Sequence, residues 1–148
     1  MPAPADEPPK DALVRYLEDR FACAQSCTEC ARACAARVSS GDRADLAAGA
    51  QGPARPPAAG ADPDPGGRAP QEPRRTLLLC VEICDATCRL LSEEALRDEY
   101  ALRLQVEWCR AVALECAHAC DRVPDAEGCA ERCRACARAC SDFLVTLG

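Results

Sequence analysis

Residues 23–34 read CAQSCTECARAC, and residues 129–140 read CAERCRACARAC. In both stretches the cysteines follow one another at steps of four, three and four residues. An α-helix turns by about 100° per residue, so such a run keeps its thiols within a stripe about 60° wide. Each stretch therefore predicts a helix that carries a column of thiols along one side.

Two further segments carry cysteines at helical spacing. They contain Cys80, Cys84 and Cys88 in the first case and Cys109, Cys116 and Cys120 in the second. The second set follows the same spacing of four, three and four residues, with Ala113 where one of the cysteines would be. No segment shows the alternation of a β-strand. The sequence thus predicts an all-α protein with four thiol-bearing helices.

Proline, glycine and capping residues divide the chain. Helices are predicted at 10–38, 74–97, 98–121 and 126–147. Asp98 and Asp125 are the expected N-caps of the last two. Residues 1–9 and the Pro/Gly-rich linker 39–73 are expected to be disordered. Residues 10–148 are expected to form one domain around this linker, which is either a tolerated insertion or a mobile cover.

Short connections between the later helices favour an antiparallel up-down-up-down four-helix bundle with a cysteine-lined core. At one end of the bundle, this topology brings together Cys34, Cys80, Cys120 and Cys129. The lowest level should contain Cys23, Cys88, Cys109 and Cys140. Below it, a plug of bulky side chains is expected from Tyr16, Leu91, Leu102, Phe143 and Leu147. Beyond the level of Cys34, Cys80, Cys120 and Cys129, Leu77 is the only bulky residue on the cysteine side of its helix. This end is therefore the expected mouth of the bundle, and its thiols should react first with bulky reagents.

Composition excludes several functions. The formal net charge is −6, and no basic stripe with interleaved aromatic residues suggests nucleic-acid binding. No apolar stretch approaches the ~20 residues that span a bilayer, so no membrane association is expected. No export signal is visible, so the expected compartment is the cytoplasm. Thiols stay reduced there, and a cysteine-rich pattern is more often metal-binding than disulfide-forming.

Soft thiolate ligands suit Cu(I), Zn and iron–sulfur clusters. Cu(I) fits best, because Cu⁺ replacing a thiol proton leaves the site neutral, whereas Zn²⁺ on four thiolates leaves about two surplus negative charges. Alternatives are a thiolate buffer for Zn²⁺ or Cd²⁺, or an iron–sulfur electron carrier, although cluster proteins usually have Gly and Pro around their cysteines. The CxxxCxxC spacing also occurs in radical S-adenosylmethionine enzymes, which need a much larger barrel. A purely structural role for the cysteines is disfavoured because residues 22–36 contain no Leu, Ile, Val, Phe or Met.

The chain has one histidine, His118, about 200° from Cys116 and Cys120 on the helical wheel. It is expected to be exposed, with a role near the mouth as the alternative. No Ser/His/Asp or Cys/His catalytic arrangement can be built from one histidine outside the core, so no enzymatic activity is expected.

Four stretches resemble the cysteine-rich four-helix-bundle copper storage proteins of the cytosolic type: FACAQSCTECARAC (21–34), LCVEICDATCRLL (79–91), ECAHAC (115–120) and CAERCRACARACSDFL (129–144). The resemblance implies storage or detoxification of many Cu(I) ions along the bundle axis, a homotetramer, and possible copper donor or acceptor proteins. It implies a metal-ligand role for all fourteen cysteines. The chain departs from the family in its long linker, in its modest cysteine count and in lacking histidines just after the third helix.

Overall fold

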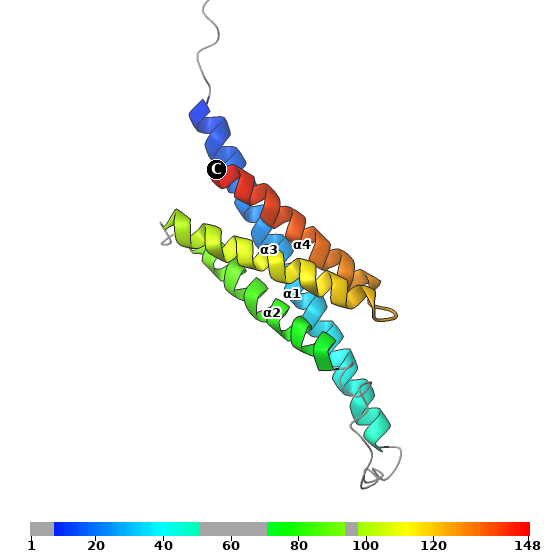
Figure 1. Ribbon diagram of the computed structural model, residues 1–148. Helices are drawn as coiled ribbons and strands as arrows, with labels where there is room; N and C mark the ends of the chain where they lie inside the picture. Colours follow the sequence, from blue (N-terminus) through cyan, green and yellow to red (C-terminus); the bar gives the residue numbers. More distant parts are fainter. Residues whose placement is uncertain (1–7, 51–70, 94–97) are drawn as a thin grey trace, which may run out of the picture.

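The computed structural model describes residues 8–50, 71–93 and 98–148, and every regular element among them is an α-helix (Figure 1). The helices are α1 (Pro8–Ala50), α2 (Gln71–Ser92), α3 (Glu99–Asp121) and α4 (Glu127–Leu147). The protein is therefore all-α, as predicted. None of these helices has an apolar stretch that would let it cross a membrane.

Consecutive helices run in opposite directions (Figure 1). Cys23 of α1 contacts Cys140 of α4, whereas Cys34 contacts Cys129, so these two helices are antiparallel. Each helix packs against two neighbours, with α1 beside α2 and α4, and α3 beside the same two. This arrangement surrounds one shared interior, into which all four helices can direct side chains.

The ends of α3 and α4 lie within one residue of the predicted bounds. Asp98 caps α3 as expected, since its Oδ1 accepts from the backbone nitrogens of Tyr100 at 3.0 Å and Ala101 at 3.2 Å. The predicted cap of α4 is wrong. The N-cap is Ala126, and Asp125 instead takes a positive φ of 63° that completes the turn after Pro124.

The linker predicted at 39–73 is wrong at both ends, because α1 continues to Ala50 and α2 begins at Gln71. Ser40 lies within the helix, where its hydroxyl donates to the carbonyl of Ala36 at 2.9 Å. Pro73 is tolerated because the first turn of a helix leaves its backbone N–H groups unpaired. α2 also ends earlier than predicted, at Ser92. The predicted disorder at 1–9 is wrong for residues 8 and 9, which form the start of α1. The predicted disorder at 51–70 and 1–7 lies outside the described residues.

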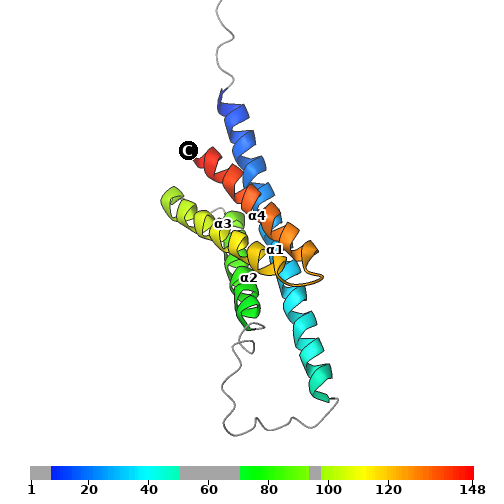
Figure 2. The same ribbon diagram turned by 45° about the vertical axis from the view of Figure 1, so that its right-hand side comes forward.

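α1 projects beyond the other helices at both ends, and this extension accounts for its C-terminal end (Figure 2). Its last turns, which we call the α1 tail (residues 37–50), run beside the start of α2. The carboxylate of Asp42 in the α1 tail pairs with the guanidinium of Arg74 at 3.1 Å. Both side chains are about half-exposed, so the pair contributes little to stability.

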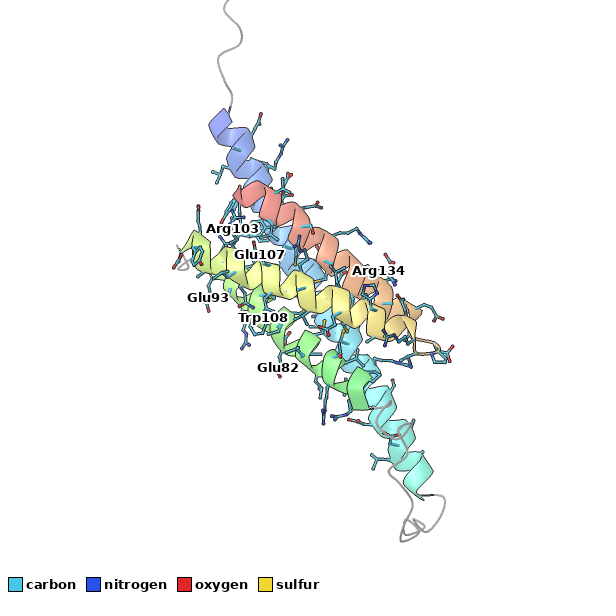
Figure 3. All side chains as sticks on the ribbon, viewed as in Figure 1. Glu82, Glu93, Arg103, Glu107, Trp108 and Arg134 are labelled. Atoms are coloured by element: carbon cyan, nitrogen blue, oxygen red, sulfur yellow. The ribbon has the colours of Figure 1, made fainter. Side chains whose placement is uncertain are left out.

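The core changes in character along the bundle axis. Phe143, Leu102, Leu91 and Val106 are buried at one end, where the ring of Tyr16 also packs on Phe143 with centroids 5.6 Å apart. The predicted plug is therefore present. The middle and opposite end contain mainly thiols and alanines. Charged side chains such as Glu82, Glu107 and Arg134 point away from the bundle (Figure 3), and Thr87 is the one buried polar or charged side chain among the described residues.

Candidate metal centre

The helical spacing of the cysteines buries nearly all their thiols in one column. Thirteen of the fourteen predicted ligands are buried, and Cys88 alone is half-buried. None of the fourteen forms a disulfide. Eleven have no exposed surface; Cys120 and Cys129, at the predicted mouth, are 3% and 8% exposed. The interior is thus a reduced, almost solvent-free row of sulfur atoms.

One group of four thiols lies toward the plug. It consists of Cys27, Cys109, Cys136 and Cys140, whose sulfur atoms all lie within 4.8 Å of one another. The sulfur of Cys27 is 3.7 Å from that of Cys109 and 3.8 Å from that of Cys136. Three helices contribute to this group, so folding alone assembles it.

A second group of four lies toward the mouth. It consists of Cys30, Cys34, Cys80 and Cys133, again with all sulfur atoms within 4.8 Å. The sulfur of Cys30 lies 3.6 Å from both Cys80 and Cys133. The helices α1, α2 and α4 supply these ligands.

The two groups are continuous. Cys84 forms a third set with Cys30 from one group and Cys136 from the other. The column continues to Cys116 and Cys129 at the mouth, each within 3.7 Å of the sulfur of Cys34. A soft metal ion bound at any point of the column would have further thiolates within reach on either side.

The level assignment predicted from the sequence is partly wrong. Cys34 and Cys129 do meet at one end, and Cys23 lies 3.7 Å from Cys140 at the other. However, Cys84, which the sequence spacing places level with Cys30, Cys116 and Cys133, lies within 4.0 Å of Cys109 and Cys136, one level deeper than predicted. The prediction assumed that α1 ends where α2 begins. Because α1 instead continues past the start of α2, the thiols of α2 are shifted relative to those of α1.

Cys88 is the predicted ligand that the structure does not bring to the others. A step of four residues advances about 40° around a helix, so two such steps rotate it away from the core. Thr87 takes the inward position and donates its hydroxyl to the carbonyl of Ile83 at 2.7 Å. Cys88 lies on the side, with its sulfur 3.0 Å from the hydroxyl of Thr28.

Thiols within the column hydrogen-bond to one another, and these bonds set their acidity. A bond to Cys109, another to Cys136 and burial hold the pKa of Cys27 well above its ordinary value. At the mouth, a hydrogen bond from Cys116 lowers the pKa of the Cys129 thiol to about 4. Shifts of both directions occur along the column, since hydrogen bonds from neighbouring thiols also lower the pKa of Cys30 and Cys109 and raise that of Cys120 at the mouth. Thiolate is the form that binds metals, so a bound metal ion would replace the proton of each thiol that is still protonated.

The mouth opens into a cleft that the sequence did not reveal. We call it the mouth cleft; it has a volume of about 910 Å³ and is lined by residues 37–45 of α1, 73–77 of α2 and 115–126 of α3 and the following turn. Cys120 and the exposed His118 both line it. Its α1 wall was missed because residues 39–41 resemble a helix end. Residues 42–50 nevertheless contain no proline and many alanines.

Comparison with known proteins identifies the family of the chain. A model of the family "copper storage protein" matches residues 65–145. Among solved structures, the H111A mutant of Ccsp from Streptomyces lividans is similar, with 27% identity, a TM-score of 0.53, and coverage of 94% of this chain and 97% of that one. No curated protein sequence matches.

Two further structures describe copper-loaded forms. One shows copper loading to a cytosolic copper storage protein from S. lividans with five coppers; it is 27% identical, with a TM-score of 0.51 over 91% of this chain and 93% of that one. The other is S. lividans Ccsp loaded with 10 copper equivalents, at 26% identity and a TM-score of 0.51 over 98% of this chain and 92% of that one. Since the family match spans more than half of the residues, the chain belongs to the copper storage protein family.

Proposed function

We propose that this protein stores multiple Cu(I) ions by binding them to the cysteine thiolates inside the bundle. The observation that carries the proposal is the continuous column of thiols, in which two groups of four are joined by Cys84. Thiolates are the ligands that Cu(I) prefers, and one thiolate can bridge two ions. The similar S. lividans protein is described as loaded with 10 copper equivalents, which supports the same role for this chain.

Charge favours copper over divalent metals. Among the described residues no basic side chain is buried, so nothing in the interior neutralises surplus thiolate charge. A Cu⁺ ion that replaces one thiol proton leaves the column neutral. A Zn²⁺ ion on four thiolates carries about two negative charges, and burying many such sites would cost several kcal/mol each. The thiol column can bind Zn²⁺ or Cd²⁺ at single sites, but it is not suited to filling with them.

We propose the buried cysteines as the copper ligands, with Cys88 at the periphery. Storage needs no catalytic residue, and the interior offers only thiols and Thr87 as polar groups among the described residues. By similarity to the cytosolic S. lividans protein, we place the storage role in the cytoplasm. We also propose a homotetramer with copper donor or acceptor proteins as partners, which native mass spectrometry of the purified protein would test.

Titration of the reduced apoprotein tests the storage function. Cu(I) should be taken from a competing chelator until on the order of ten ions are bound per chain, because each thiolate can pair or bridge. A parallel titration with Zn²⁺ should saturate at far fewer ions, and the copper-loaded protein should be colourless, unlike an iron–sulfur protein. Saturation at one or two Cu(I) ions would contradict storage.

A further inference from the structure

The mouth cleft has the size and the setting of a binding site for a small molecule. Its volume of about 910 Å³ lies within the usual range for ligand sites. Three separate segments wall it, namely the α1 tail, the start of α2 and the end of α3. It also adjoins the thiol column, since Cys120 lines it and lies one helical turn from Cys116, whose sulfur is 3.7 Å from that of Cys34. A molecule bound there would contact the outermost thiols directly.

The charge of the mouth cleft differs from that of the chain. The whole sequence has a formal net charge of −6. The cleft is instead lined by four arginines and three carboxylates: Arg37, Arg74, Arg75 and Arg122 against Asp42, Asp45 and Glu115. The cleft thus has a local excess of positive charge, on a surface that elsewhere repels anions.

Two of these arginines are available to bind an anion. Arg74 is paired with Asp42 at 3.1 Å, and Arg37 donates to the backbone carbonyl of Pro124 at 3.0 Å. Arg75 and Arg122 are exposed, and neither has an ion pair within the described residues. A guanidinium binds a carboxylate through two parallel hydrogen bonds, which fixes the orientation of the ligand as well as its position.

We infer that the mouth cleft binds a small thiol bearing free carboxylates, which carries Cu(I) and transfers it to Cys120. The inference rests on the proposed storage function and names the form in which copper arrives. Arg75 and Arg122 would bind the carboxylates and so hold the carrier sulfur beside the Cys120 sulfur. Transfer is then a ligand exchange: a bond forms between copper and Cys120 while the bond to the carrier breaks. The Cys120 proton leaves with the carrier thiolate, and copper remains Cu(I) throughout.

The rate of copper transfer tests the inference. The carriers are Cu(I)–glutathione, which has two carboxylates, and Cu(I)–glutathione dimethyl ester, which has the same thiol without them. The double variant Arg75→Glu/Arg122→Glu should take copper from glutathione about tenfold more slowly but should not be slowed with the ester. The matched control is Arg89→Glu/Arg110→Glu, which makes the same charge change at exposed arginines that do not line the cleft. It should behave like the unmodified protein with both carriers.

Binding can also be measured without copper transfer. S-methylglutathione retains both carboxylates but has no free thiol. Added to the apoprotein, it should shift the NMR signals of the His118 ring, which lines the cleft and is the one histidine of the chain. The shift should disappear in Arg75→Glu/Arg122→Glu and persist in the control variant.

The two failures are distinguishable. Equal transfer rates from both carriers in a protein that still fills with copper would overturn the cleft assignment and leave the storage function intact. If the control variant is also slowed with glutathione but not with the ester, the effect comes from overall charge, and the cleft assignment is likewise overturned. A protein that binds only one or two copper ions would refute the proposed function itself.

Discussion

The sulfur of Cys84 lies 3.9 Å from the sulfur of Cys109, its neighbour on the next helix of the bundle. The same sulfur lies 3.8 Å from that of Cys80, in the group of four nearer the mouth. Cys84 therefore lies between the two groups, at the point where Cys30 of one group and Cys136 of the other come within 4.8 Å of each other. This position distinguishes it from Cys88, one turn further along α2, which has no sulfur contact among the described residues.

We expect Cys84→Ser to lower the number of Cu(I) ions bound by about one or two per chain, because a hydroxyl is a poor ligand for a soft metal. Loading should also become less continuous, with one group filling well before the other. Chelator-competition titration monitored by native mass spectrometry would resolve both effects. Cys88→Ser is the matched control on the same helix and should leave capacity nearly unchanged. Equal losses in the two variants would show that Cys88 joins the column when copper binds.

Thiol reactivity in the folded apoprotein should follow the observed burial. Cys88, Cys129 and Cys120 should react first with a bulky maleimide, because they are the cysteines with exposed surface. Cys27 and Cys136 should react last. Peptide mapping at increasing reaction times would give the order. Early labelling of the deep pair would mean that the plug end opens more readily than the mouth.

The half-buried position of Cys88 corrects the sequence prediction, which placed Cys88 at the lowest level of the column. Periodicity was sufficient to orient the thiols of α1 and α4, because a 4-3-4 run fixes a side of the helix without reference to its partners. It could not give the register between helices, which depends on where α1 ends. Serine and glycine at 39–41 indicated that the helix ends there. The α1 tail nevertheless packs against α2, with Asp42 paired to Arg74, and such a contact between helices cannot be predicted from local sequence. Local propensity is a weak guide in such a case.

Stability of the apoprotein should fall as the pH rises above about 8.5. Bonds to Cys109 and burial hold the pKa of Cys27 above its ordinary value, and bonds to Cys116 and burial do the same for Cys34. Such thiols stay protonated in the native state while their counterparts in the unfolded chain ionise near pH 8.5. The native state then binds more protons, so the free energy of unfolding decreases with pH.

The expected slope is about 1.4 kcal/mol per pH unit for each such thiol. Thermal melts under reducing conditions at about pH 8.5 and about pH 10 would measure it. The copper-loaded protein supplies the comparison, because its thiolates are already deprotonated and its melting temperature should change much less. A melting temperature of the apoprotein that rises over this range would contradict the raised pKa values of Cys27 and Cys34.

The plug should determine stability without determining copper capacity. Phe143 has no exposed surface and packs on Tyr16, so Phe143→Ala should lower the free energy of unfolding of the apoprotein by about 3–5 kcal/mol. Val145→Ala, on the same helix at a side chain 81% exposed, should change it by less than about 0.5 kcal/mol. Copper binds the folded state, so loading should restore much of the melting temperature lost in Phe143→Ala. Capacity should stay at the unmodified value, since no ligand is removed. A variant that loads fewer ions at a temperature where its apoprotein remains folded would show that the plug also holds the thiols at its end of the column, Cys23 and Cys140, in binding geometry.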